Sequence, residues 1–478
     1  MRDAISADKT RAELQAWNQA DPRGFVDHTF QLQAEVRRLR DLAAQNSRNS
    51  SRPPSTDGPE QPKPKSLRPN SGRKSGGQPG HPGRTLAFSQ NPKHTEIHLL
   101  GKCACGEDLA GVSPAGYERR QVFDLPPLEL ACTEQQAEIK KCPGCRQTRT
   151  APFPAGVTAP VQYGSNFRAL LACFYDAQMG AGRRIREMCE ELFGAPVSEG
   201  ALQKARQEQF EALEPFEKRL GEILPREPVL LADETGVKVN KVTHWAHVLC
   251  TPKLTFFAAH PARGKEAIEA IGIIPRFTGW LMHDFLASYL AFDLCLHTFC
   301  KSHPLREWIF LFEQPQQAWA KDLHDLLLEM NRGVQARKAL AAPWTDAELA
   351  RWHDRYREVL GAGRQANPRT PAQNAQTRPK QAKEQNLLGR LEECEPCILA
   401  FLWAWELPFA NNGAERAGRI IKVRLKIPGC FRTLAGARRP VRIRSYIATL
   451  RKHGLPVLAY LRRALAGRPF LPLGSNST

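Results

Sequence analysis

The sequence predicts a multidomain α/β protein whose centre is a mixed sheet with helices on its faces. Two apolar runs, PVLLADET at 228–235 and TGWLMHDF at 278–285, have the length of buried strands and end in acidic residues. Two β-rich runs, VKVNKVTHWAHVLC and KLTFFAAHPA, follow the first, and the helical segment GKEAIEAIGII precedes the second. A three-stranded meander followed by strands alternating with helices is the order that favours a mixed sheet.

Composition indicates a basic globular protein with polar linkers. The chain has 478 residues, 42% hydrophobic residues and a formal net charge of +19. That length accommodates two to four domains. So broad an excess of positive charge favours nucleic acid as the partner over an acidic small molecule, although a soluble basic protein without such a partner is the alternative.

The termini and cysteines favour a cytoplasmic protein with no membrane partner. The start, MRDAISADKTRAEL, has mixed charge and no apolar core of a signal peptide. The longest apolar run, CILAFLWAWELPFA, is too short to span a bilayer and contains Glu406. The 13 cysteines are an odd number, so clustered cysteines are interpreted first as metal ligands rather than disulfides.

The amino-terminal region is expected to be a helix followed by a disordered linker. Apolar residues fall on heptad a and d spacing, which favours a short coiled coil or, equally, an amphipathic helix packed on its own domain. The linker is rich in Pro, Gly, Ser and positive charge, so it either follows a phosphate backbone or acts as a spacer. The heptad positions are Phe25, Leu32, Val36, Leu39 and Ala43.

Two close cysteine pairs predict a small zinc-binding module. Cys103 and Cys105 form the first pair, and Cys142 and Cys145 form the second after a strand-like segment of hairpin length. Four thiolates holding one Zn²⁺ can replace the core that so small a module lacks. Cys132 is a competing ligand, and two pairs of buried thiols are the alternative.

Helical regions flank the predicted sheet on both sides. The segment before it contains two amphipathic helices joined by a Gly-Ala-Pro turn, which fits ordinary helix packing better than a DNA-binding helix-turn-helix. The segment after it is helical around a polar stretch, and its Cys394 and Cys397 are expected to pack in a helix rather than bind a metal.

These patterns divide the chain into eight regions. They are a helix at 1–46, a basic linker at 47–90, a zinc module at 91–155, a helical DNA-binding or packing region at 156–225, the first part of the α/β core at 226–312, a helical insertion at 313–408, the final helical part of the core with a basic tail at 409–470, and a disordered tail at 471–478.

The basic tail begins immediately after an isolated carboxylate. Glu415 is the last acidic residue of the chain, and fifteen Lys or Arg follow it between Arg416 and Arg468. Either Glu415 lies in the first turn of a helix capped by Asn411 or Asn412, or it is a metal ligand beside a bound phosphate. The candidate DNA-binding residues are Arg416, Arg419, Lys422, Arg424, Lys426, Arg432, Arg438, Arg439, Arg442 and Arg444.

Asp233 and Asp284 are expected at the carboxyl ends of their apolar strands, where open α/β sheets place their sites, although an Asp there can also form a turn. With Glu415 they supply the oxygen ligands that two Mg²⁺ or Mn²⁺ ions require for phosphoryl chemistry. Glu234 should point to the opposite face of its strand, which excludes it from this set.

Motifs in a fixed order along the chain resemble the transposase of the insertion sequence 66 family. They are GGQPGHPG at 76–83, the module from Cys103 to Cys145, VQYGSNFRALL, LFGAPVSEG, LLADETGVKV, FCKSHPLRE at 299–307, NNGAERAGR and RIRSYIATLRKHGLPVLAYLRRALAGRPF. The resemblance implies a ribonuclease H-like, retroviral-integrase-like core, a leucine-zipper-like amino terminus, a zinc module and a helical insertion.

The resemblance also implies a DDE triad at Asp233, Asp284 and Glu415. It draws attention to Cys300, His303 and Arg306, which the sequence places in the core or around the metal ligands rather than on the metal. One position departs from the family pattern, Asp-Asn-Asn-x-Ala-Glu-Arg: Ala410 replaces its first Asp, which removes a supporting contact rather than a triad member.

The expected function is therefore that of a DDE-type DNA transposase, which cleaves element ends and joins the 3′-hydroxyl to target DNA with two divalent ions. Its expected partners are the element ends, target DNA and further copies of the chain, in a dimer or larger assembly, and the participation of accessory proteins is left open. The alternatives are an inactive relative that only binds the ends and a metal-dependent nuclease without strand transfer.

Overall fold

The computed structural model describes residues 11–46, 49–50, 80, 86–313, 316–369, 381–427 and 429–474. Most of the predicted basic linker and the last residues of the predicted disordered tail lie outside these ranges. The chain divides into two compact units. One contains Met1–Lys65, Ala151–Met188 and Val197–Thr478, and the other contains Ser66–Thr150 and Cys189–Pro196.

A five-stranded mixed sheet forms the centre of the larger unit, in the order β5-β4-β3-β6-β7. Strands β3, β4 and β5 form an antiparallel meander, whereas β6 runs parallel to β3 and β7 runs parallel to β6. The predicted mixed α/β class is confirmed. The strands are β3 (Val229–Val239), β4 (Val242–Cys250), β5 (Thr255–His260), β6 (Trp280–His283) and β7 (Leu296–Phe299).

Strand β3 is longer than its apolar run. It pairs with β6 only over Val229–Leu231 but continues along β4 to a tight turn at Asn240 and Lys241, whose φ angles are 46° and 67°. The expectation that Asp233 ends its strand is therefore wrong, because pairing with β4 carries the strand past this polar position. Asp233 lies instead just beyond the point where pairing with β6 ends.

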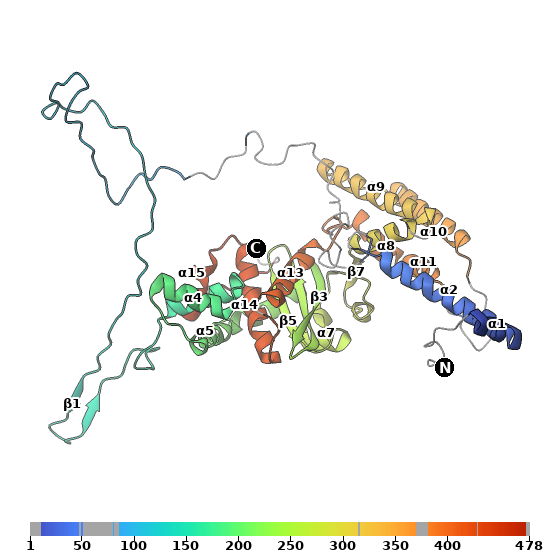
Figure 1. Cartoon of the computed structure of the whole chain (residues 1–478), viewed down its shortest axis with the longest axis horizontal. Coiled ribbons are helices and arrows are strands. Elements are labelled where there is room, and N and C mark those ends of the chain that lie inside the picture. Colours follow the sequence, from blue (N-terminus) through green and yellow to red (C-terminus); the bar gives the residue numbers. More distant parts are fainter. Residues whose placement is uncertain are drawn as a thin grey trace. The chain divides into compact units, whose positions relative to one another are not determined.

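Side-chain alternation along β3 separates two apolar cores. Leu231 packs with Val248 and Met282 against α13 (Asn412–Lys426), whereas Leu230 and its even-numbered neighbours pack on the opposite face. Figure 1 shows α13 and α14 (Leu434–Lys452) beside these strands. The opposite face carries α3 (Ser165–Ala172), α6 (Glu214–Ile223), α7 (Lys265–Ile271) and α15 (Val457–Leu465).

Helix α14 covers the outer edge of the sheet. The backbone N–H of Phe257 donates to Ser445 Oγ at 2.8 Å, and that of Thr255 donates to Thr449 Oγ1 at 3.1 Å. These hydroxyls satisfy donors of β5 that have no neighbouring strand, so the edge is closed to pairing with another chain.

A third core lies among the helices that follow β7. Thr345 and Glu348 form a capping box that starts α10 and separates it from α9. Cys394 and Cys397 pack against this core, as expected. The helices are α8 (Ser302–Glu313), α9 (Ala318–Leu340), α10 (Asp346–Ala366), α11 (Lys383–Glu393) and α12 (Glu395–Leu399).

The amino-terminal helix is interrupted at Asp21, whose side chain caps α2 (Pro22–Ala44) after α1 (Arg11–Ala20). Leu32, Val36 and Leu39 of α2 are each about half exposed, and the coiled coil stays a prediction. The remaining elements are α4 (Gly182–Phe193), α5 (Glu199–Ala212), the π-helix η3 (Cys173–Ala177), the 3₁₀ turns η4 (Leu224–Arg226), η5 (Ile274–Arg276), η6 (Tyr289–Ala291) and η7 (Ala400–Leu402), and the hairpin β1 (Ile139–Lys141) and β2 (Thr148–Thr150) of the smaller unit.

None of the helices in the described ranges combines the length and apolar character needed to cross a membrane.

Candidate active site

Glu415 lies in the first turn of α13, and a buried asparagine fixes the start of that helix. Asn411 is the N-cap residue, but its side chain makes no capping hydrogen bond. Its Nδ2 donates instead to the carbonyl of Ala232 on β3 at 2.7 Å. Because Ala232 immediately precedes Asp233, this bond ties the start of α13 to the strand that carries the first predicted carboxylate.

Two glycines allow α13 to approach β3 closely. A Cβ at position 413 would lie 2.8 Å from Leu231 Cδ1, so a larger residue there would require the Leu231 side chain or the helix to move. A Cβ at position 418 would lie 3.6 Å from Asp233 Oδ2. The Asp233 carboxylate therefore lies beneath α13, within one helical turn of Glu415.

This arrangement leaves the negative charge at Asp233 only partly compensated. Burial first, and then the charges of Glu234 and Glu415, raise the pKa of Asp233 to about 7, although a backbone hydrogen bond from Glu234 and the charge of His303 oppose this shift. Buried carboxylates that lie close together favour the binding of a proton or a cation among them. The chemistry of these oxygen donors fits a hard divalent ion.

Replacing Asp233 with Asn is expected to stabilise the metal-free protein at pH 8 but not at pH 4. The pKa of an unfolded Asp is about 3.9, so ionisation of folded Asp233 costs stability increasingly between about pH 4 and 7. A shift of about three units corresponds to at most roughly 4 kcal/mol, and several degrees in melting temperature are expected. The measurement is thermal unfolding against pH in a chelator.

The matched control for this prediction is Asp322→Asn, at an exposed position of α9. As the pH rises from 4 to 8, wild type and this control should both lose the stability that ionisation of Asp233 costs. Asp233→Asn should not show this loss. Equal pH dependence in all three proteins would contradict the assigned environment of Asp233.

Asp284 follows β6 directly, as predicted. It stands two residues beyond Met282, which pairs with Leu231, and Asp233 stands two residues beyond Leu231. The two aspartates thus each lie two residues beyond the last residue that pairs between the parallel strands β3 and β6. Asp284 Oδ1 accepts a hydrogen bond from the N–H of Leu286 at 2.9 Å, and its Oδ2 lies 3.8 Å from Arg263 Nη2.

Sequence reasoning missed the network around Glu234. The Glu234 carboxylate accepts from Arg263 Nε at 2.8 Å and from the Tyr289 hydroxyl at 2.9 Å. Burial, and then the charge of Asp284, raise the pKa of Glu234, while Arg263 and Tyr289 counteract them. Glu234 therefore holds the guanidinium of Arg263 next to Asp284. Neither Arg263 nor Tyr289 belongs to a motif that would have identified it.

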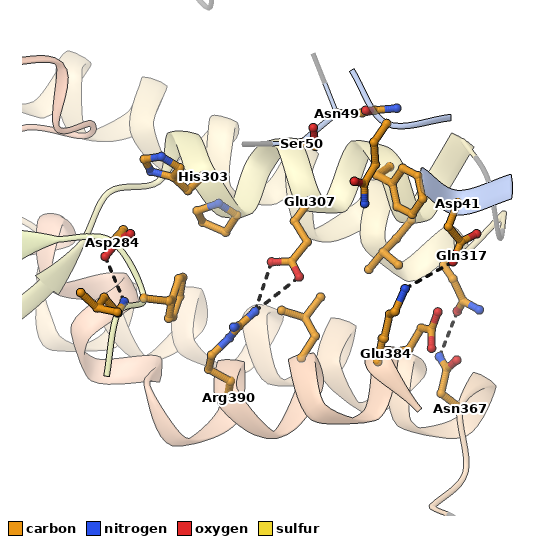
Figure 2. A pocket seen from close by; sticks show the side chains of 18 of the residues that line it. Asp41, Asn49, Ser50, Asp284, His303, Glu307, Gln317, Asn367, Glu384 and Arg390 are labelled. Carbon is orange, nitrogen blue, oxygen red and sulfur yellow. Dashed lines mark hydrogen bonds and ion pairs between the residues drawn. The ribbon is translucent and has the colours of Figure 1, made fainter. Parts of the chain in front are cut away.

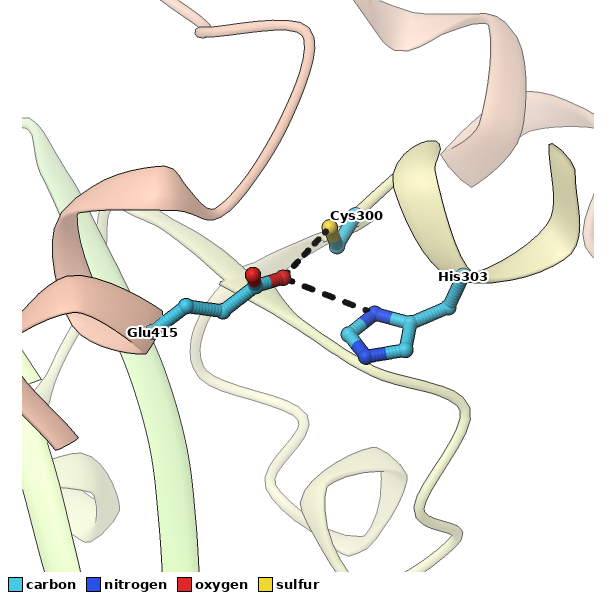
Figure 3. A group of neighbouring side chains, drawn as sticks. All are labelled: Cys300, His303 and Glu415. Atoms are coloured by element: carbon cyan, nitrogen blue, oxygen red, sulfur yellow. Dashed lines mark hydrogen bonds and ion pairs between the residues drawn. The ribbon is translucent and has the colours of Figure 1, made fainter. Parts of the chain in front are cut away.

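Cys300 and His303 lie against Glu415. Cys300 Sγ is 3.7 Å and His303 Nδ1 is 3.9 Å from the same carboxylate oxygen (Figure 3). Within the described part of the chain, these three residues form the one group of at least three metal-binding side chains whose ligand atoms all lie within 4.8 Å of one another. The three predicted acidic ligands do not meet that distance as a set. Arg306 is half-buried on α8.

The predicted zinc ligands lie in the smaller unit as two separate pairs. Hydrogen bonds from the backbone and thiol of Cys105 lower the pKa of Cys103, and those from Cys145 lower the pKa of Cys142. Cys142 and Cys145 occupy the turn between β1 and β2. Among the described residues the four sulfurs do not form one close group, and Cys132 is exposed, so the zinc module stays a prediction.

The predicted DNA-binding residues fall into two sets. Arg424 and Arg444 are buried: Arg424 Nη1 lies 3.9 Å from Asp176 Oδ1, and Arg444 donates to the Asp176 carbonyl at 3.0 Å. Arg439 and Arg442 are held by side chains of Gln207 and Glu217. The exposed set consists of Arg416, Arg419, Lys422 and Lys426 along one side of α13, with Arg432 and Arg438.

A groove adjoins Asp284 in the larger unit (Figure 2). Asp284 and His303 lie at one end, and Asp41, Gln317 and Asn367 lie at the other. Arg390 is paired with Glu307 at 3.1 Å, and Lys383 with Asp41 at 3.4 Å. Arg37 and Arg40 of α2 also line the groove, together with Arg263.

Comparisons with known proteins identify two family matches. The profile described as "Transposase IS66 family" matches residues 160–439, which is more than half of the chain. A second profile, described as "Family of unknown function (DUF6444)", matches residues 4–87. No curated protein matches the chain. The first match contains the whole sheet, α13 and all three predicted acidic ligands.

Proposed function

Because the chain belongs to the IS66 family of transposases, we propose that it cleaves the ends of an insertion element and joins the freed 3′-hydroxyl to target DNA. Family membership implies a DNA-processing enzyme whose partner is DNA. The observation that carries the finer proposal is the position of Glu415 on α13, which packs on β3, the strand that bears Asp233, while Asp284 directly follows the neighbouring parallel strand β6.

Asp233, Asp284 and Glu415 would hold the divalent ions. All three offer carboxylate oxygens, the ligands that Mg²⁺ and Mn²⁺ prefer. The raised pKa of Asp233 supports this assignment, because neighbouring protein groups offset the negative charge of the site only in part. When bound, the ions would activate the attacking oxygen and neutralise charge on the leaving oxygen of the phosphodiester.

Other residues of the chain would position these carboxylates and the DNA. Asn411 fixes α13 on β3 through the Ala232 carbonyl, and Arg263 holds its guanidinium between Glu234 and Asp284. The exposed side of α13 would bind phosphates through its basic residues. Arg37 and Arg40 line the groove and have no ion pair with any described residue, so they are also available to a DNA backbone.

We further assign the five-stranded sheet and α13 to a ribonuclease H-like catalytic core. The antiparallel meander followed by two parallel strands, with carboxylates on neighbouring strands and on a helix packed across them, supports this assignment. A zinc module at Cys103, Cys105, Cys142 and Cys145 and self-association through α2 remain parts of the same proposal.

The experiment is an assay of purified full-length protein with Mg²⁺ on duplex DNA carrying the element ends and a target plasmid. The proposal predicts both nicked ends and covalently joined products. An inactive end-binding relative would shift the DNA in a gel and leave it intact. A nuclease without strand transfer would yield cut ends and no joined product. Either outcome would overturn the proposed activity.

A further inference from the structure

A thiol, an imidazole and a carboxylate from three elements converge beside the proposed catalytic carboxylates. Cys300 follows β7, His303 lies in the first turn of α8, and Glu415 lies in the first turn of α13. Figure 3 shows the Cys300 and His303 side chains directed at one oxygen of Glu415. The three ligand atoms all lie within 4.8 Å of one another.

Hydrogen bonding accounts for only part of this convergence, because the Cys300 thiol donates to Glu415 at 3.7 Å but His303 makes no such bond. At 3.9 Å, His303 Nδ1 is too far from the Glu415 oxygen for a hydrogen bond, and this buried nitrogen has no hydrogen-bond partner among the described residues. Zn²⁺ binds sulfur at about 2.3 Å and nitrogen or oxygen at about 2.0–2.2 Å, so tetrahedral ligands stand roughly 3.3–3.6 Å apart. Small side-chain rotations would bring these three atoms to that spacing.

Backbone donors at Cys300 offset part of the burial that keeps its thiol protonated. Its Sγ accepts a hydrogen bond from the N–H of Asn411 at 3.2 Å. Burial, and then the charge of Glu415, raise the pKa of Cys300 to about 11, whereas backbone N–H groups, including those of Ser302 and His303 at the start of α8, oppose this shift. Backbone donors at a sulfur stabilise the negative charge that a metal-bound cysteine carries. An ion entering the site would displace the thiol proton to solvent.

We propose that Cys300, His303 and Glu415 bind a borderline-soft divalent ion such as Zn²⁺, with a fourth position open to water. A sulfur, a nitrogen and one oxygen suit Zn²⁺ and are poor ligands for Mg²⁺. Glu415 is common to this set and to the proposed oxygen-only set with Asp233 and Asp284. On the proposed function, Zn²⁺ at this position would therefore withdraw Glu415 from the catalytic ions and inhibit cleavage.

The test uses Co²⁺ as a spectroscopic substitute for Zn²⁺ in the full-length protein. Wild type is compared with Cys300→Ser, His303→Ala and Glu415→Gln, and the matched control is Cys430→Ser, which removes an exposed thiol elsewhere. Each of the first three changes is expected to remove one bound Co²⁺ per chain. Cys300→Ser should also remove the sulfur-to-cobalt absorption of one thiolate, and Cys430→Ser should change neither quantity.

His303→Ala is the second variant because it removes a side chain that is 29% exposed and leaves the packing of buried Cys300 in place. If Cys300→Ser and His303→Ala both bind as many Co²⁺ ions as wild type, with unchanged absorption, the site does not exist. Counting bound Co²⁺ does not require activity, so this test can fail or succeed independently of the proposed function.

A second experiment measures inhibition of cleavage by Zn²⁺. Where cleavage is measurable, His303→Ala should raise the Zn²⁺ concentration for half-inhibition about tenfold or more. An unchanged concentration would refute the proposal that Zn²⁺ withdraws Glu415 from the catalytic ions.

Discussion

Asp233→Ala, Asp284→Ala and Glu415→Gln are each expected to reduce Mg²⁺-dependent cleavage and strand transfer by roughly 10³-fold or more. Each change removes one of the proposed oxygen ligands on β3, after β6 or on α13, and on the proposed function the remaining two would not hold both ions in place. DNA binding should persist, because we assign it to the exposed basic residues of α13 and of the groove, which these variants leave in place. The measurement combines cleavage and joining rates with binding to the same DNA.

The control for these variants is Glu406→Gln, an exposed carboxylate that precedes α13 and lies outside the site. It should cleave and bind DNA as wild type does. A variant of Asp233, Asp284 or Glu415 that cleaves at the wild-type rate would remove that residue from the catalytic set. Loss of DNA binding in step with cleavage would instead indicate damage to the fold.

Asp176→Asn is expected to destabilise the larger unit by about 3–5 kcal/mol. Asp176 is fully buried in η3, and its carboxylate accepts two hydrogen bonds from Arg206 at 2.8 and 2.9 Å. Arg424 of α13 and Arg444 of α14 are buried around the same residue. Burial lowers the pKa of Arg444 to about 10. Without this carboxylate, three guanidinium groups would stay buried with little compensating charge.

This change should also disturb the active site, since Arg424 lies on the helix that carries Glu415. Denaturant unfolding measures the loss of stability, and Asp354→Asn at an exposed position of α10 is the matched control. Adding Arg206→Gln to Asp176→Asn should restore part of the stability, because it removes one of the uncompensated charges. A loss below about 1 kcal/mol in the single variant would show that the buried arginines do not depend on Asp176.

The sheet was predictable because its strands are apolar runs of suitable length bounded by polar residues. The extent of β3 was not, because Gly236 and the charged Lys238 interrupt the apolar pattern while pairing with β4 continues through them. The prediction consequently ended the strand at Asp233, whereas β3 ends six residues later, at Val239. The position of Asp284 directly after β6 was predicted correctly, since nothing extends that short parallel strand.

The site itself was only partly accessible from sequence. The start of α13 was anticipated from Asn411 and Asn412, yet the Asn411 side chain reaches across to Ala232 instead of capping its own helix. Long-range contacts of this kind leave no local pattern. The same holds for Arg263, which meets Glu234 and Asp284 from a loop after β5, and for Arg424 and Arg444, whose positive charge is compatible with either a surface or a buried ion-pair network.

The central claim is that Asp233, Asp284 and Glu415 together hold the catalytic ions. Anomalous scattering from crystals of the full-length protein soaked in Mn²⁺ tests it most directly. The account predicts bound Mn²⁺ at about 2.0–2.3 Å from oxygens of all three residues, with any two ions roughly 4 Å apart. Mn²⁺ that is coordinated by Glu415 with Cys300 and His303, while both aspartates remain free of metal, would contradict it.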